Sequence, residues 1–267
     1  MLSVLVPCVF LLVPTTSDQA LQIVNPRTTY GYLGATRPKE GMLPGDVAHF
    51  TFEIKNLKFD AQGKAMYSIA IEIRDADGKL FFEQKPYNAV AQNFLGGNSL
   101  PCSAHVAIPV NAKPGAVNWK ITVKDRAANQ TVSINGSGKV LPADFGIVQV
   151  GLWADADTRT PMSAVGVIGD SAYLQFALVG FGRDKENKQP HVHVSMRILD
   201  EQGKPTMAKP LTSPFNSDVR PDAHFIPVQF GMSMNRAGRF TIELTAEDRI
   251  SGKSSQIRYA IRVLAAE

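Results

Sequence analysis

The second half of this 267-residue chain repeats the first half in register. Gly45-Asp46 recurs as Gly169-Asp170, 124 positions later (169 − 45), and Asp125-Arg126 recurs as Asp248-Arg249, 123 positions later (248 − 125). Offsets that return to nearly one value indicate a duplicated domain whose loops have gained and lost residues. Solenoid and propeller repeats are much shorter, roughly 20 to 50 residues. The pattern therefore predicts two tandem domains.

Apolar and polar residues alternate in both copies, and they do so in the same phase. The clearest matched set comprises Phe50, Phe52 and Ile54 in the first copy, and Leu174, Phe176 and Leu178 in the second. Such alternation is typical of strands with one face on a core and the other in water. Asp77-Gly78 and Gln202-Gly203 follow predicted strands and supply the glycine that a tight hairpin requires. We expect an all-β chain of two antiparallel β-sandwiches, over residues 21–142 and 143–267.

Charge and the first 20 residues bear on where the chain acts. The net charge is +4, and its 28 Lys and Arg are scattered among 24 acids without basic runs, which argues against a nucleic-acid partner. Residues 1–20 contain an apolar run, Val4–Val13, followed by small residues at Thr15 and Ser17. This pattern resembles a secretory signal peptide, and the run is too short to span a bilayer, so we predict export and no transmembrane segment.

Removal of that segment would leave one cysteine, Cys102. No disulfide within the chain and no cysteine-based metal site would then be possible, so each domain must be held by its apolar core. A half-buried spectator thiol is the interpretation we favour over a nucleophile.

A short segment near the end of each copy resembles a known family. Gly238–Lys253, echoed by Gly115–Ala128, is similar to the penultimate hairpin of bacterial immunoglobulin-like and fibronectin-type-III-like modules. The resemblance covers about fifteen residues per copy and concerns the fold. It implies a sandwich of seven or eight strands used as a spacer, adhesive or binding module.

Two clusters could hold a metal ion. His191 and His193 lie two apart on a predicted strand, and His224 would complete a three-histidine zinc site, hence a metal-dependent hydrolase as one alternative function. In the alternation that the two copies share, His191 and His193 fall at positions that face solvent, whereas His224 falls at a position that faces the core. The three side chains would then lie on different sides of a sheet, so we favour surface histidines and predict no cofactor. Asp75–Gly78 resembles the start of a calcium loop, but Lys79 stands at a ligand position, which favours a hairpin turn.

Segments that differ between the copies are better candidates for binding, because folding already explains the shared scaffold. Pro86–Pro101 is six residues longer than its counterpart (124 − 118) and carries Tyr87, Phe94 and Leu95. Gln229–Arg236 is five longer (123 − 118) and carries Phe230, Met232 and Met234. Loops with aromatic or methionine side chains suit partner contacts. The alternative is that both fold back over the ends of the sandwiches.

These patterns predict a non-catalytic, exported bacterial protein of the periplasm, cell surface or extracellular space. It would act as a binding or structural module that contacts a protein or glycan. A periplasmic chaperone of the pilus type, which also joins two immunoglobulin-like domains, is a second alternative. The pattern leaves the partner's identity and the oligomeric state open.

Overall fold

The computed structural model describes residues 19–38 and 41–266, and within those ranges the chain forms strands and no helix. No helix there could therefore cross a membrane. The predicted signal peptide falls almost wholly on residues 1–18, outside the described residues. The strands of the first half are β1 (Gln22–Thr29), β2 (Val47–Lys55), β3 (Lys64–Asp75), β4 (Leu80–Gln92), β5 (Ser99–Ala107), β6 (Gly115–Asp125) and β7 (Gln130–Val140). Those of the second half are β8 (Gly146–Trp153), β9 (Val165–Val167), β10 (Ser171–Val179), β11 (Val192–Leu199), β12 (Leu211–Phe215), β13 (Ile226–Ser233), β14 (Gly238–Asp248) and β15 (Lys253–Leu264).

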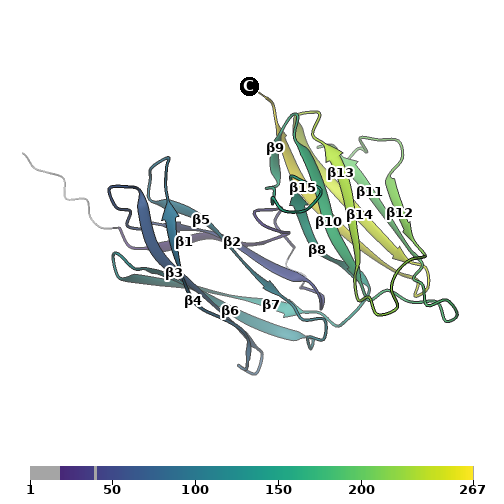
Figure 1. The fold of residues 1–267 in the computed structure, drawn as a ribbon, viewed down its shortest axis with the longest axis horizontal. Helices are drawn as coiled ribbons and strands as arrows, with labels where there is room; N and C mark the ends of the chain where they lie inside the picture. The colour runs from purple at the N-terminus through teal and green to yellow at the C-terminus, as the bar shows by residue number, and fades with distance from the viewer. Residues whose placement is uncertain (1–18, 39–40, 267) are drawn as a thin grey trace, which may run out of the picture.

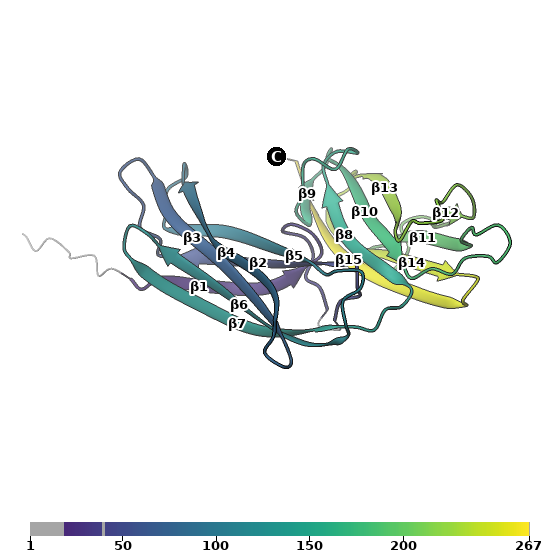
Figure 2. The same ribbon diagram turned by 60° about the horizontal axis from the view of Figure 1, so that its bottom comes forward.

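The two halves have the same strand order. In the first half the sheet β1-β2-β5 faces the sheet β4-β3-β6-β7, and in the second half β8-β10-β13 faces β12-β11-β14-β15. The second half adds β9, which pairs in parallel with the end of β15. Figures 1 and 2 show the halves arranged end to end, with β1–β7 at the left and β8–β15 at the right. The all-β sandwich prediction is confirmed, whereas independent folding of 21–142 and 143–267 stays a prediction.

Each half has its own apolar core between its two sheets. Phe50, Phe52 and Ile54 of β2 are buried in the first core, and Leu174, Phe176 and Leu178 of β10 are buried in the second. The matched alternation places these side chains inward in both copies. Each fully buried side chain of this size contributes roughly 1.5–3 kcal/mol relative to exposure.

The repeated Asp-Arg pair marks a buried turn carboxylate. Asp125 accepts the backbone N–H of Lys58 at 2.7 Å, and Asp248 accepts that of Gly182 at 2.7 Å. Burial alone would raise the pKa of Asp248, but hydrogen bonds from Ser251 and from backbone N–H groups outweigh it and hold the pKa below its usual range. In each half this carboxylate ties the turn after β6 or β14 to the segment that follows β2 or β10.

The segment from Asp75 to Gly78 is a hairpin turn, as predicted. Asp75 Oδ1 accepts the N–H of Asp77 at 3.1 Å and of Lys79 at 2.9 Å. Asp200 makes the same pair of bonds in the second copy, and Gly78 has a φ of 77°. These carboxylates organise the turn that joins each strand to the next.

Direct contacts fix the two halves to each other. Asp46, which is buried, pairs with Arg37 at 2.5 Å, and its Oδ1 accepts the backbone N–H of Gln149 at 2.8 Å. The Gln149 amide donates to the carbonyl of Gly45 at 2.8 Å. Gln149 has a φ of 55° at an irregularity in the β8–β10 pairing, which turns its N–H toward the first half. Two polar groups of the second half are thus satisfied by the first.

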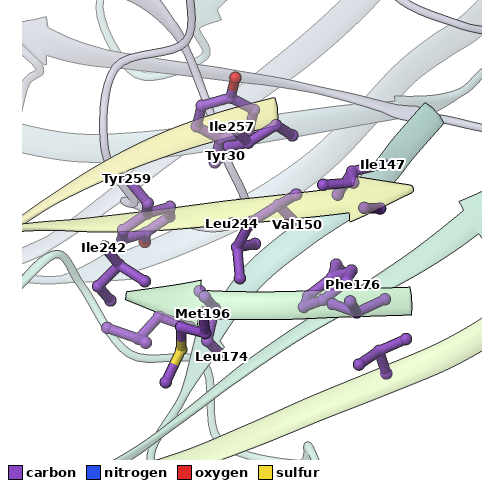
Figure 3. Packing of buried hydrophobic residues seen from close by; sticks show 14 of the residues in the cluster. Tyr30, Ile147, Val150, Leu174, Phe176, Met196, Ile242, Leu244, Ile257 and Tyr259 are labelled. Atoms are coloured by element: carbon purple, nitrogen blue, oxygen red, sulfur yellow. The ribbon is translucent and has the colours of Figure 1, made fainter. Parts of the chain in front are cut away.

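The loop after β1 completes the core of the second half. Tyr30 and Ala35 belong to the first half in sequence, yet both are buried in the second core. The ring of Tyr30 lies 6.1 Å from that of Tyr259 in β15, and Figure 3 shows it beside Ile257 and Tyr259. Burial raises the pKa of Tyr259 to about 12. The second sandwich is therefore closed by a segment outside its own residues.

Candidate functional site

The predicted binding loop Pro86–Pro101 is mostly strand, because it contains the end of β4 and the start of β5, which belong to the two different sheets of the first half. Residues 86–92 belong to β4 and residues 99–101 to β5, so only residues 93–98 form the connection. The prediction of a loop was wrong. The difference in length between the two copies gives the number of inserted residues, but it does not show whether they form a loop or extend the neighbouring strands. Tyr87 is 67% exposed, Phe94 87% and Leu95 100%.

Hydrogen bonds define the turn between β4 and β5. The N–H of Asn93 donates to the carbonyl of Gly63 at 2.8 Å, and its side-chain amide donates to the carbonyl of Gly97 at 3.1 Å. Gly96 and Gly97 have φ values of 76° and 81°, which suit glycine. The turn is thus formed without help from the side chains of Phe94 and Leu95. We call these two side chains the loop tip.

Further apolar side chains are exposed on β3 and β4 at the end of these strands that lies near this turn. Met66 of β3 and Val90 of β4 are cross-strand partners, and both are exposed. They border a shallow hollow of about 330 Å³ whose other apolar lining residues are Phe59 and Ala127. The outer face of the β3–β4 pair therefore presents apolar side chains next to the loop tip.

The second predicted loop, Gln229–Arg236, is also largely strand. Strand β13 continues to Ser233, and Phe230 packs against the core with its ring 6.2 Å from that of Phe176. Met234 is buried in the same core and is therefore not available for a partner contact. Phe230 and Met234 therefore follow the alternative interpretation of the sequence, in which this segment folds back onto the sandwich.

Met232 lies in a groove at one end of the second half. The groove has a volume of about 680 Å³, and four methionines line it: Met196, Met207, Met232 and Met234. Lys204 and Arg236 stand among its other lining residues, as does Asp200. Methionine side chains adapt to irregular apolar partners, so this groove could accept an apolar side chain. It lies in the other half from the loop tip, and the structure does not bring the two predicted sets together.

The three histidines do not form a metal site. His191 is exposed and His193 half-buried, consistent with the solvent phase of β11. His224 was predicted to face the core but is exposed, because β13 begins only at Ile226 and the alternation does not extend back to the bend before it. Among residues 19–38 and 41–266, no three His, Cys, Asp or Glu side chains are grouped so as to hold a metal ion.

Cys102 lies within β5 and is buried, so it is more enclosed than the half-buried thiol that we predicted. Burial raises the pKa of its thiol to about 12. A thiol with this pKa is almost entirely protonated at neutral pH and is a poor nucleophile.

Sequence reasoning missed a pair of neighbouring histidines. His49 of β2 and His105 of β5 are direct cross-strand partners, with ring centroids 5.7 Å apart. Burial, and then the neighbouring His105, lower the pKa of His49 to about 4. Only the register of β2 against β5 brings them together, and the alternation of residues along each strand does not specify that register.

Comparisons with known proteins identify no family. No family model matches the chain, and no curated protein matches it. Among solved structures, it is similar to dimeric latent PorU from Porphyromonas gingivalis, with 13% identity and a TM-score of 0.42 over 94% of this chain and 21% of that one. It is also similar to the C-terminal domain of the AgI/II polypeptide BspA of Streptococcus agalactiae, with 8% identity and a TM-score of 0.30 over 89% of this chain and 99% of that one.

A third similar structure is red sea bream transglutaminase, with 10% identity and a TM-score of 0.29 over 92% of this chain and 31% of that one. The chain thus spans less than a third of the length of two of these three proteins. TM-scores this low carry no functional argument, and the assignment of a β-sandwich fold rests on the strands and sheets themselves.

Proposed function

We propose that this chain is an exported, non-catalytic binding protein of the bacterial envelope or extracellular space, and that the loop tip contacts a protein partner. The observation that carries the proposal is the exposure of Phe94 (87%) and Leu95 (100%) on a turn that backbone and Asn93 bonds already define. Folding gains nothing from these two apolar side chains. Contact with a partner would remove both from water, and each would then contribute roughly 1.5–3 kcal/mol.

A protein partner fits this surface better than a glycan. The exposed groups of the tip and the adjoining outer face are aliphatic, aromatic and thioether side chains, including Val90 and Met66. Sugar hydroxyls would need polar partners, whereas an apolar patch on another protein would not. Asn93, the polar side chain nearest the tip, is engaged with Gly97.

The two alternatives predicted from the sequence gain no support. A metal-dependent hydrolase would need His191, His193 and His224 together, and they are not grouped. A pilus-type chaperone would need an Arg and a Lys that are both free to anchor a partner in the cleft between the halves. Arg37, which lies there, is paired with the buried Asp46.

The test compares the native chain with the variant Phe94→Ser/Leu95→Ser. Both immobilised proteins are incubated with the secreted or periplasmic fraction of the source organism, and bound proteins are identified by mass spectrometry. We expect one partner to be retained by the native chain and at least ten-fold less by the variant. Because both side chains are exposed, the urea midpoints of the two proteins should agree.

The variant Leu80→Ser is the matched control, since Leu80 is an exposed apolar residue at the opposite end of β4. It should retain the partner like the native chain. Equal retention by the native chain and the tip variant, or equal loss in both variants, would refute the proposal.

A further inference from the structure

The second half shows how the open side of this sandwich is closed. The loop of residues 30–35 lies between β8 and β15, with Gly31 against Gly151 and the hydroxyl of Tyr259 against Gly34. Tyr30 fills the space next to Tyr259. The loop belongs to the first half of the sequence, so the opening of the second sandwich is filled by residues of the first half.

The first half has the equivalent opening, between β1 and β7. The pairing Ile23 with Ile54 corresponds to Ile147 with Leu178, and both β1 and β8 carry a register shift just after this pair. Across the other sheet, the pair Trp119–Gly136 corresponds to Ile242–Tyr259. Gly136 and Gly138 of β7 thus stand where Tyr259 and Ile261 stand in β15.

Glycine at these two positions leaves a groove of about 590 Å³. A side chain on Gly136 would overlap the indole of Trp119, which therefore lies over this glycine. The indole also packs on Phe50, with ring centroids 5.1 Å apart. The groove consequently has an aromatic wall at the place where the second half accepts Tyr30.

The charges at this groove are all positive among the described residues that line it. Arg27 and Lys139 are exposed there, and neither has a carboxylate partner within the described part of the chain. The third cation, Arg37, is paired with Asp46. No Asp or Glu lines the groove among these residues. A ligand with carboxylates would thus find uncompensated cations at the rim.

The neighbouring surface shows what size of partner fits. In the second half, Ala177 and Val179 of β10 pack under Leu43 and Phe225. The equivalent residues of β2 are Glu53 and Lys55, so the first half lacks this apolar platform. A segment inserted between β1 and β7 is therefore favoured over a whole domain docked beside them.

We propose that this groove binds an exposed peptide segment of a partner protein, in which an aromatic side chain packs on Trp119 and flanking carboxylates pair with Arg27 and Lys139. The site is separate from the loop tip, and it uses the binding mode that the chain already applies between its own halves.

The probe is a synthetic peptide with the chain's own loop sequence Thr29–Thr36 and two aspartates at each end. A second peptide carries alanine in place of both tyrosines. Binding is followed by the fluorescence of Trp119 in the full chain with Trp153→Phe. We expect a saturable change below about 1 mM for the tyrosine peptide and at least ten-fold weaker binding for the alanine peptide.

Two variants locate the site. Gly138→Ile introduces the residue that the second half has at this position. A Cβ atom added to Gly138 meets only Val117, at an ordinary 3.5 Å, so we expect the side chain to fill the groove without disturbing the fold. Arg27→Glu/Lys139→Glu reverses the rim charges on exposed side chains. Each should weaken binding at least ten-fold.

The control Phe94→Ser/Leu95→Ser should bind the peptide like the native chain, which separates this site from the proposed partner surface. No fluorescence change up to 1 mM, equal binding of the two peptides, or unchanged binding by both groove variants would overturn the proposal.

Discussion

Truncation of Tyr30 gives the sharpest test of how the two halves depend on each other. Tyr30 is 6% exposed and packs in the core of the second half beside Tyr259. Its neighbours there are strands held in hydrogen-bonded sheets, which cannot collapse into the space left by Tyr30→Ala. Truncation of a large buried aromatic side chain costs about 3–5 kcal/mol. The free energy of unfolding of the second half should fall by this amount, although the substitution lies in the first half of the sequence.

The assay is urea unfolding followed by single tryptophans. Trp153 lies at the end of β8 and reports on the second half, whereas Trp119 lies in β6 and reports on the first. With Trp119→Phe as background and a urea dependence of about 2 kcal/mol per molar, Tyr30→Ala should lower the midpoint reported by Trp153 by roughly 1.5–2.5 M. In the Trp153→Phe background, the midpoint reported by Trp119 should move less.

The matched control is Tyr32→Ala, because Tyr32 is in the same loop but is exposed. It should change stability by no more than about 0.5 kcal/mol. An unchanged Trp153 midpoint in Tyr30→Ala, or an equal shift in the two variants, would show that the loop does not complete the second core.

Three further predictions concern the ionisable side chains of Asp46, Cys102 and His49. Asp46→Ala leaves Arg37 without its partner and removes the acceptor of the Gln149 N–H, so it should lower the free energy of unfolding in urea by about 3–5 kcal/mol. The loss should be clearly larger than that caused by Asp170→Ala at the matched position of the second half. Equal losses would contradict a role of Asp46 between the halves. Cys102, with a thiol pKa of about 12, should not react with a disulfide reagent at pH 8 until the chain is unfolded. Rapid labelling of Cys102 itself in the folded protein, with Cys8 replaced by serine, would contradict its burial. The pKa of His49 in the folded chain is about 4, below the ordinary value of 6.5. Between pH 6.5 and pH 4, His49 therefore binds a proton in the unfolded chain but not in the folded one. The free energy of unfolding consequently decreases as the pH falls from 6.5 toward 4. Because His49 is only half-buried, the loss should be at most about 2 kcal/mol, and His49→Gln should flatten the pH dependence of the urea midpoint above pH 5; an unchanged slope would contradict the assignment.

The sequence predicted the local structure well where a single physical rule applied. Alternation placed Phe50, Phe52 and Ile54 inward, and a glycine soon after each predicted strand placed the turns at Gly78 and Gly203. It failed where strand ends matter. His224 lies just before the first residue of β13, so its phase carries no information. The extra residues after Pro86 lengthen two strands, an outcome that a count of inserted residues cannot distinguish from a long loop.

What the sequence alone determined is the all-β fold and the matched phase of its two copies, because both follow from the order of side chains along an extended chain. The tertiary structure decided how the copies are closed. Tyr30 enters the second core, Asp46 binds Gln149, and the glycines of β7 leave the first half open beside Trp119. Each of these features depends on residues that are far apart in the sequence. The periodicity of a single strand shows which side chains face the core, but it does not show which other segments pack against them.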